Sequence, residues 1–247
     1  MSEVRASGAE RGIRIARFLA AAGIASRRDA ELMIAAGRVR LNGEVVQHPA
    51  TFVGPTDLVQ ADGKTVDPPS RTRLWRYHKP PGLLTTHRDP KGRPTVFASL
   101  PPDLPRVISV GRLDFASEGL LLLTNDGALA RRLELPSTGW KRRYRARVHG
   151  AVDRNALAAL SQGVTIAGIT YGPITAGIDA RRGTNSWLAL SLCEGKNREV
   201  RRVLGDLGLT VSRLIRIAYG PFQLGRLPRG HVQEVPAKVI REQLGRI

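Results

Sequence analysis

The sequence predicts an α+β protein with a small N-terminal module and a larger domain built on a β-sheet flanked by helices. After a small, polar tail at residues 1–11, which we expect to be disordered, apolar residues at helical spacing lead into two hairpin signals within residues 12–66. Residues 67–73 are rich in proline and arginine, which is typical of a linker. From there to residue 240, strand-like runs outnumber the helical segments. These three observations predict two domains.

The N-terminal module is expected to begin with two helices. Apolar positions recur at helical spacing over residues 13–24, and Gly23 is expected to end this first helix. Ser26 is predicted to cap a second helix over residues 27–36, because a hydroxyl at this position accepts a hydrogen bond from a free backbone N–H group. Gly37 is expected to end the second helix.

Two hairpins are predicted to complete the module. The pair Asn42-Gly43 separates short apolar runs at residues 39–41 and 44–46, and it is the preferred pair for a two-residue turn. Asp62-Gly63 is predicted to form a second such turn between residues 58–59 and 65–66.

The larger domain is predicted to alternate strands, turns and two or three helices. Strands are expected at residues 74–78, 107–110, 120–124, 144–149, 165–169, 174–179, 187–192 and 211–217. Helices are expected at residues 128–135, 154–162 and 198–207, and residues 95–99 fit either state.

The charge balance points to a polyanionic partner. The 247 residues include 39 Lys and Arg against 21 Asp and Glu, a formal net charge of +18. A surplus of this size favours nucleic acid as the partner. Arginine makes up most of the basic residues and suits phosphate and base edges, although a GC-biased genome also enriches it. The apolar share of 42% is enough to build a core without disulfides.

Several other classes are excluded by what the sequence lacks. Cys193 is the single cysteine, so neither an internal disulfide nor a cysteine-rich zinc site can form. We expect it to be a buried residue without a chemical role, and a reducing, cytoplasmic location fits. The five histidines show no metal-ligand spacing, and no phosphate-binding loop motif occurs. The longest leucine run, residues 120–123, is too short to span a membrane, and arginines interrupt the apolar residues 13–25, which argues against a signal peptide.

The segment from Gly111 to Gly127 carries the strongest chemical signal. It reads Gly-Arg-Leu-Asp-Phe-Ala-Ser-Glu-Gly and then four leucines before Thr-Asn-Asp-Gly, so Asp114 lies in a turn between two strands. A carboxylate in such a turn can face a cleft and act in chemistry. Alternatively, Asp114 caps its own turn by accepting a hydrogen bond from the N–H group of Ala116 or Ser117. The spacing alone leaves both interpretations open.

Residues 12–60 resemble an S4 RNA-binding domain. The resemblance rests on Arg14-x-x-Arg17-Phe-Leu, on Gly23-Ile-Ala-Ser-Arg-Arg-x-Ala-Glu, and on Ile34-x-x-Gly-x-Val-x-Leu-Asn-Gly. It implies that the module presents a set of arginines to RNA, namely Arg14, Arg17, Arg27, Arg28, Arg38 and Arg40. A solvated basic helix face is the alternative interpretation.

The rest of the chain resembles the pseudouridine synthases of the RsuA family, which modify ribosomal RNA and carry an N-terminal S4 domain. The segment around Asp114 looks like their catalytic motif, and other family blocks begin at Lys79, Asp89, Lys141, Glu194 and Val211. The resemblance implies a catalytic domain over residues 74–240 with a mixed, mainly antiparallel sheet. It also implies an isomerisation that needs no cofactor and no metal.

By this resemblance, three residues take catalytic roles. Asp114 would attack a uridine at the ribose or the base, so that the glycosidic bond breaks and the base rotates. Tyr144 would lie against the flipped uracil as the group that abstracts a proton or stacks on the base, although it could also be a core tyrosine on an alternating strand. Arg201 would pair with Asp114 and hold it ionised, since an adjacent positive charge lowers the pKa of a carboxyl. Arg202 is the second candidate for this role.

Further residues are expected to contact RNA. Arg112 would fill the space that the flipped base leaves in the helix. Lys196, Asn197 and Arg198 lie in a loop before a helix and suit phosphate or base contacts, as does Arg202.

The resemblance is closest to the branch that modifies the large ribosomal subunit at 23S rRNA, known as type B. A 16S rRNA target stays open, as does a non-catalytic ribosome-assembly protein that uses only its S4 module. The expected partner is ribosomal RNA or an assembly intermediate of a ribosomal subunit. We expect a monomer with no membrane partner and no nucleotide cofactor.

Overall fold

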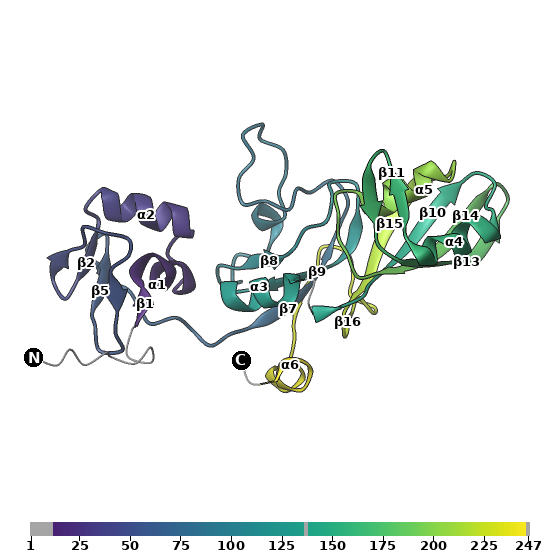
Figure 1. Cartoon of the computed structure of the whole chain (residues 1–247). Helices are drawn as coiled ribbons and strands as arrows, with labels where there is room; N and C mark the ends of the chain where they lie inside the picture. Colours follow the sequence, from purple (N-terminus) through teal and green to yellow (C-terminus); the bar gives the residue numbers. More distant parts are fainter. Residues whose placement is uncertain (1–11, 136–137, 246–247) are drawn as a thin grey trace, which may run out of the picture. The chain divides into compact units, whose positions relative to one another are not determined.

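The computed structural model describes residues 12–135 and 138–245, so the predicted tail at residues 1–11 lies outside the described residues. The chain divides into two compact units. The N-terminal unit comprises Met1–Thr72 with Pro105–Val107, and the C-terminal unit comprises Arg73–Leu104 with Ile108–Ile247. Figure 1 follows the chain through both units.

The N-terminal unit packs two short helices against small antiparallel sheets (Figure 1). Its elements are β1 (Ile13–Arg14), α1 (Ile15–Ala21), α2 (Arg27–Ala35), β2 (Val39–Leu41), β3 (Glu44–Val45), β4 (Phe52–Val53), β5 (Val59–Ala61) and β6 (Lys64–Thr65). Among the described residues the larger sheet has the order β3-β2-β5-β6, and β1 pairs with β4. Ile15, Leu19 and Val39 are fully buried in the core between helices and strands.

Local signals in the N-terminal unit act as the sequence predicts. The Ser26 side chain accepts a hydrogen bond from the N–H group of Asp29 at 3.1 Å and caps α2. Asn42 and Gly43 both have positive φ angles, 53° and 90°, as a tight hairpin turn between β2 and β3 requires. Both predicted helices and both predicted hairpins are therefore confirmed.

The C-terminal unit is built on one large mixed sheet. Its strands are β7 (Leu74–Lys79), β8 (Ile108–Val110), β9 (Glu118–Thr124), β10 (Arg142–His149), β13 (Ile174–Arg182), β14 (Asn185–Leu192), β15 (Thr210–Tyr219), β16 (Phe222–Gln223) and β17 (Val232–Glu234). In the described chain the order is β13-β14-β10-β15-β9-β7-β17, with β16 on β15 and β8 on β9. The pairing of β15 with β9 is parallel, and the other pairings in this sheet are antiparallel. The predicted α+β class with a mixed, mainly antiparallel sheet is confirmed.

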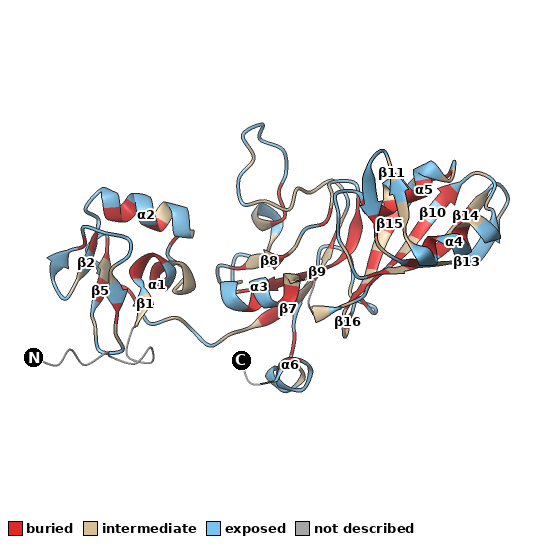
Figure 2. Ribbon diagram, in the orientation of Figure 1, coloured by how far each residue is buried: buried red, intermediate tan, exposed pale blue. Residues whose placement is uncertain are grey.

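Short helices cover parts of this sheet. They are α3 (Gly127–Glu134), α4 (Arg154–Ala159), α5 (Glu199–Asp206), α6 (Ala237–Leu244) and two 3-10 turns, η1 (Phe97–Ser99) and η3 (Leu160–Gln162). Helices α3 and α6 share a core with β7 and β9 that includes Leu120, Leu122, Leu133 and Ile240. All seven residues of β9 are buried, so this strand lies in the core of the unit. Figure 2 colours the buried residues of the chain red.

Two predictions for the C-terminal unit are wrong or incomplete. The sequence predicts a single strand over residues 165–169, but these residues belong to a hairpin of β11 (Val164–Ile166) and β12 (Ile169–Tyr171). Ala167 and Gly168 form its turn with φ angles of 48° and 76°, and alanine is an unusual residue for such an angle. Helix α6 and the short strands β16 and β17 are absent from the predicted elements.

Candidate active site

Asp114 lies in the loop between β8 and β9. Gly111 turns the chain with a φ angle of 65°, and the N–H group of Ser117 donates to the carbonyl oxygen of Asp114 at 3.0 Å. The turn is thus closed by the main chain. Within the described ranges, the Asp114 carboxylate makes no hydrogen bond or ion pair, so it does not cap its own turn. The side chain is half-buried and available for chemistry.

The side chain of Lys79, the last residue of β7, braces this loop by binding its backbone carbonyl oxygens. The Lys79 side chain is fully buried, and its ammonium group donates to the carbonyl oxygens of Ser117 at 2.9 Å and Asp114 at 3.2 Å. Further contacts reach the carbonyl oxygens of Pro80 and Phe115. Burial lowers the pKa of Lys79 to about 8, although the nearby charges of Asp114 and Glu118 oppose this shift. The backbone of the loop is therefore fixed by a buried cation.

Sequence reasoning does not find this role of Lys79. The residue stands out there only as the first of the block Lys79-Pro80-Pro81-Gly82. Its partners in the Asp114 loop lie 35 to 38 residues further along the chain, and they are backbone carbonyls, which have no residue-specific signature.

Arg201 reaches the same loop from α5. Its guanidinium donates to the carbonyl oxygens of Val211 at 2.8 Å and Ala116 at 3.1 Å. Burial lowers the pKa of Arg201, the charge of Arg198 lowers it further, and the Asp114 carboxylate raises it. Arg201 and Asp114 therefore interact electrostatically.

Arg201 and Asp114 are expected to form an ion pair, but Arg201 contacts the backbone of the Asp114 loop instead. No nitrogen of Arg201 lies within 4.0 Å of the Asp114 carboxylate in the described chain; instead, Arg201 binds the backbone two residues beyond Asp114. Arg202, the second candidate, points elsewhere, since its guanidinium contacts Tyr171 and Asn197.

Tyr144 lies in a row of residues that crosses three strands. On β10 it faces Arg216 of β15, and Arg216 in turn faces Gly119 of β9, which follows the loop of Asp114. Tyr144 is 9% exposed, so its ring is largely packed in the sheet. The register brings Tyr144 two strands away from the end of the Asp114 loop.

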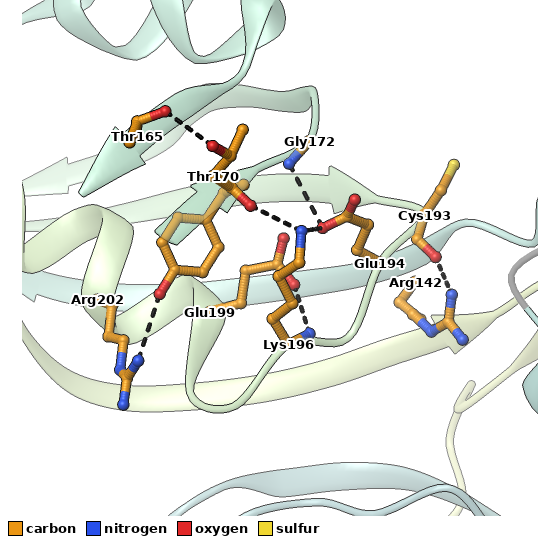
Figure 3. A network of polar contacts seen from close by, with 10 residues as sticks. Arg142, Thr165, Thr170, Gly172, Cys193, Glu194, Lys196, Glu199 and Arg202 are labelled. Atoms are coloured by element: carbon orange, nitrogen blue, oxygen red, sulfur yellow. Dashed lines mark hydrogen bonds and ion pairs between the residues drawn. The ribbon is translucent and has the colours of Figure 1, made fainter. Parts of the chain in front are cut away.

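Residues 194–199 form a polar network with the β11–β12 hairpin, drawn in Figure 3. The ammonium of Lys196 pairs with Glu194 at 2.5 Å and donates to the carbonyl oxygen of Thr170 at 2.7 Å. The backbone N–H group of Lys196 donates to the buried Glu199 at 2.8 Å. The charge of Lys196, a predicted RNA contact, is thus already paired within the protein.

Two neighbours of Lys196 remain more open. Asn197 and Arg198 are exposed, and Arg198 adopts a left-handed conformation with a φ angle of 51°. Arg112 is likewise exposed, and the described residues offer its side chain no hydrogen bond. The hydrogen-bond donors of these side chains are therefore accessible to another molecule.

The six arginines of the N-terminal unit that are predicted to contact RNA divide into two groups. Arg14, Arg17, Arg27 and Arg28 are exposed and have no ion pair in the part of the chain that the structure describes. Arg38 instead pairs with Asp62 at 2.6 Å, and Arg40 donates to the carbonyl oxygen of Gly43 at 2.8 Å. The first group is the freer to bind phosphate.

Cys193 corrects one expectation. It is exposed and follows the end of β14, whereas the sequence predicts a buried position. The backbone explains this, because the burial alternation of β14 ends with Leu192. The described residues contain no cluster of His, Cys, Asp or Glu able to hold a metal ion, and no helix among them is long and apolar enough to cross a membrane.

Comparisons with known proteins identify the class of protein to which this fold belongs. A family model described as RNA pseudouridylate synthase matches residues 73–205, and a model of the S4 domain matches residues 13–59. The first match covers more than half of the chain. The chain belongs to the RNA pseudouridine synthase family and carries an S4 domain, so it is an isomerase.

Individual relatives agree with this assignment. The chain is 44% identical to an uncharacterized RNA pseudouridine synthase of Rickettsia prowazekii, over 94% of this chain and 97% of the relative. It is 42% identical to the ribosomal large subunit pseudouridine synthase B of Haemophilus influenzae, over 98% of this chain and 71% of that protein. A solved structure described as a pseudouridylate synthase matches with a TM-score of 0.65 and 25% identity, over 94% of this chain and all of the other.

Proposed function

We propose that this protein converts a uridine of ribosomal RNA, within 23S rRNA, to pseudouridine, and that Asp114 is the catalytic carboxylate. The observation that carries the proposal is the free carboxylate of Asp114 on a loop whose backbone is held by Lys79 and Arg201. The relative in Haemophilus influenzae, named for the large ribosomal subunit, supports the choice of 23S rRNA.

The reaction rearranges bonds without adding or removing atoms. The target nucleotide leaves the RNA stack, because C5 and the glycosidic bond are otherwise covered. Asp114 assists the break of the bond between C1′ and N1, either as a nucleophile or by stabilising the positive charge on the sugar. The uracil then rotates and forms a bond from C5 to C1′. The proton on C5 is released, and N1 takes up a proton.

The surrounding residues are assigned supporting roles. Arg201 stabilises the negative charge near Asp114, and the brace by Lys79 keeps the carboxylate in place during base rotation. Tyr144 contacts the displaced uracil, and Arg112 occupies its place in the RNA stack. We assign residues 12–66 to RNA binding through the S4 domain, residues 67–73 to a linker and residues 74–240 to catalysis.

The Asp114→Asn variant tests the catalytic assignment. We expect it to lose pseudouridine formation by at least about a thousandfold, as when other enzymes lose a catalytic nucleophile. Release of tritium from 23S rRNA that carries tritium at uridine C5 measures the rate, and filter binding measures RNA affinity. Affinity should stay within about twofold of wild type, because the phosphate contacts are unchanged.

A matched control removes a different carboxylate. Asp103 is exposed in a loop of the same unit, and Asp103→Asn should leave the rate unchanged. A wild-type rate for a folded, RNA-bound Asp114→Asn variant would contradict the assignment. Tritium release from 16S rather than 23S rRNA would contradict the substrate. No release from either would favour the non-catalytic RNA-binding alternative.

A further inference from the structure

A cavity of about 360 Å³ lies beside the Asp114 loop and has no role in the site described above. Its walls are formed by Pro81, Ala116, Glu118, Ser212, Arg213 and Arg229. Pockets of roughly 300–1,000 Å³ are the usual size for small ligands or ligand groups. Ala116 places one wall two residues from Asp114, within the C-terminal unit.

Glu118 organises the charges of this cavity. Its side chain is 3% exposed, and one carboxylate oxygen accepts from Nε of Arg213 at 2.5 Å. The other oxygen pairs with Nη2 of Arg229 at 3.0 Å. The arginine side chains are 43% and 51% exposed. One buried carboxylate thus orients two accessible guanidinium groups, and the cluster carries a net charge of +1.

Arg213 is held from a second direction. Its guanidinium lies over the ring of Trp187 at 5.8 Å, and Arg145 lies over the same ring at 4.9 Å. Arg145 is itself paired with Asp179 at 2.6 Å. The two terminal Nη groups of Arg213 donate no hydrogen bond within the described ranges. Arg213 therefore presents fixed, unused donors, which lowers the entropic cost of binding a ligand.

We propose that Arg213 and Arg229 form a binding site for one RNA phosphodiester, that of a nucleotide adjacent to the uridine that enters the site of Asp114. Arginine favours this ligand because its planar fork matches two phosphate oxygens. Glu118 has a positioning role, since it fixes both guanidinium groups without using their remaining donors. This inference rests on the proposed function for the identity of the RNA.

The competing explanation is purely structural. A buried carboxylate is costly without partners, and Arg213 and Arg229 could serve only to neutralise Glu118. The two explanations differ in what happens when Glu118 loses its charge. Neutralisation removes the structural need for the arginines, but it creates no new phosphate contact.

Single variants test the phosphate site. We expect Arg213→Gln and Arg229→Gln each to weaken binding to a 23S rRNA transcript by about three- to tenfold. Each should also reduce the slope of log affinity against log salt by about 0.7–0.9, the amount expected for one lost phosphate contact. Arg241→Gln, which removes an exposed arginine from α6, is the matched control and should change none of these values.

A double variant separates the two explanations. Glu118→Gln combined with Arg213→Gln should regain any thermal stability that Arg213→Gln loses. Its RNA affinity and salt slope should still be lower than those of Glu118→Gln alone, because these two variants differ only in the charge and donors of Arg213. Unchanged affinity and slope in both single variants would overturn the inference. Equal affinity and salt slope of the double variant and of Glu118→Gln alone would also overturn it.

The readouts distinguish this inference from the proposed function. If wild type binds the transcript but releases no tritium, the proposed function fails, and the salt slopes of the variants still decide on the phosphate site. If wild type isomerises uridine while both variants bind normally, only the phosphate site fails. Absence of any binding by wild type would overturn both.

Discussion

At Glu199, burial and hydrogen bonding act on the carboxyl group in opposite directions. Glu199 is 4% exposed at the start of α5, and one of its oxygens accepts the N–H group of Lys196. The other oxygen, Oε1, is buried with no hydrogen-bond partner among the described residues. Burial raises the pKa of Glu199 above its ordinary value, and the hydrogen bond from Lys196 only partly offsets this. The ionised side chain therefore lowers the stability of the fold.

This balance predicts that Glu199→Gln is more stable than wild type at pH 7. A carboxyl whose pKa is raised on folding favours the fold below its unfolded pKa, about 4.3, and loses that contribution as pH rises through the folded pKa. The higher stability of Glu199→Gln should therefore appear as pH rises through the folded pKa of Glu199, and it should disappear below about pH 4.3. Urea unfolding from pH 4 to pH 7.5 measures it.

Glu194 supplies the control of opposite sign. Its pKa is lowered, first by the hydrogen bond from Lys196, so its ionised form is favoured in the fold. Glu194→Gln should consequently be no more stable than wild type at pH 7, and slightly less stable if the exposed ion pair contributes. Equal behaviour of the two variants across this pH range would contradict the assigned environments.

At the scale of elements, the parallel pairing of β9 with β15 joins the two halves of the sheet. Gly119 sits at this junction with a φ angle of 109°, opposite Arg216. A Cβ atom at Gly119 would lie 2.3 Å from the carbonyl oxygen of Arg216. Only glycine allows this close approach, and the Asp114 loop enters β9 immediately before it.

Gly119→Ala is therefore expected to be strongly destabilising. The strained φ angle costs about 1–3 kcal/mol, and the overlap with backbone atoms adds about 1–3 kcal/mol more. Denaturant unfolding measures the loss, and any soluble fraction should show a reduced kcat because the Asp114 loop shifts.

Gly177 provides a matched comparison in the same sheet. It lies in β13 with open space where a Cβ would be. Gly177→Ala should be neutral or slightly stabilising, because alanine loses less chain entropy on folding. If Gly119→Ala lost no more stability than Gly177→Ala, the close approach at the β9–β15 junction would be refuted.

At the scale of the whole molecule, the net charge of +18 is not equivalent to 18 free positive charges. Some arginines are committed to internal pairs, such as Arg38 with Asp62 and Arg73 with Glu234. Others, including Arg27 and Arg28, are exposed without an ion pair in the described chain. We expect the second kind to contribute fully to RNA affinity and an arginine that is paired one to one with a carboxylate to contribute much less. Arg213 and Arg229 differ from such pairs, because two arginines share the single carboxylate of Glu118.

This distinction predicts the salt dependence of RNA binding. Replacing Arg14, Arg17, Arg27 and Arg28 with glutamine should reduce the slope of log affinity against log salt by up to about 3.6, at about 0.7–0.9 for each phosphate contact. Arg38→Gln should change the slope by much less, because Asp62 already neutralises Arg38. Filter binding between 50 and 300 mM salt, about the range in which such contacts weaken, measures both. An unchanged slope in the fourfold variant would assign the electrostatic attraction to the C-terminal unit.

Much of the fold could be predicted because its signals are local. Ser26 caps a helix with a backbone group three residues away, and Asn42-Gly43 needs only its own φ angles to reverse the chain. The alternation of buried and more exposed residues in β10 likewise follows from the order of residues within one strand. In contrast, the Ala167-Gly168 turn escapes prediction because alanine rarely adopts a positive φ angle.

The candidate site likewise combines local motifs, which the sequence shows, with long-range contacts, which only the tertiary structure shows. Asp114, Tyr144 and Arg201 stand out in contiguous motifs, and these patterns lie within single segments. The brace by Lys79, the binding of Arg201 to a backbone carbonyl and the cluster of Glu118 with two arginines depend on strand order and on the parallel junction at Gly119. Each joins residues 35 or more positions apart. Such contacts depend on which chain segments pack together, because backbone carbonyls and long-range ion pairs leave no pattern among neighbouring residues.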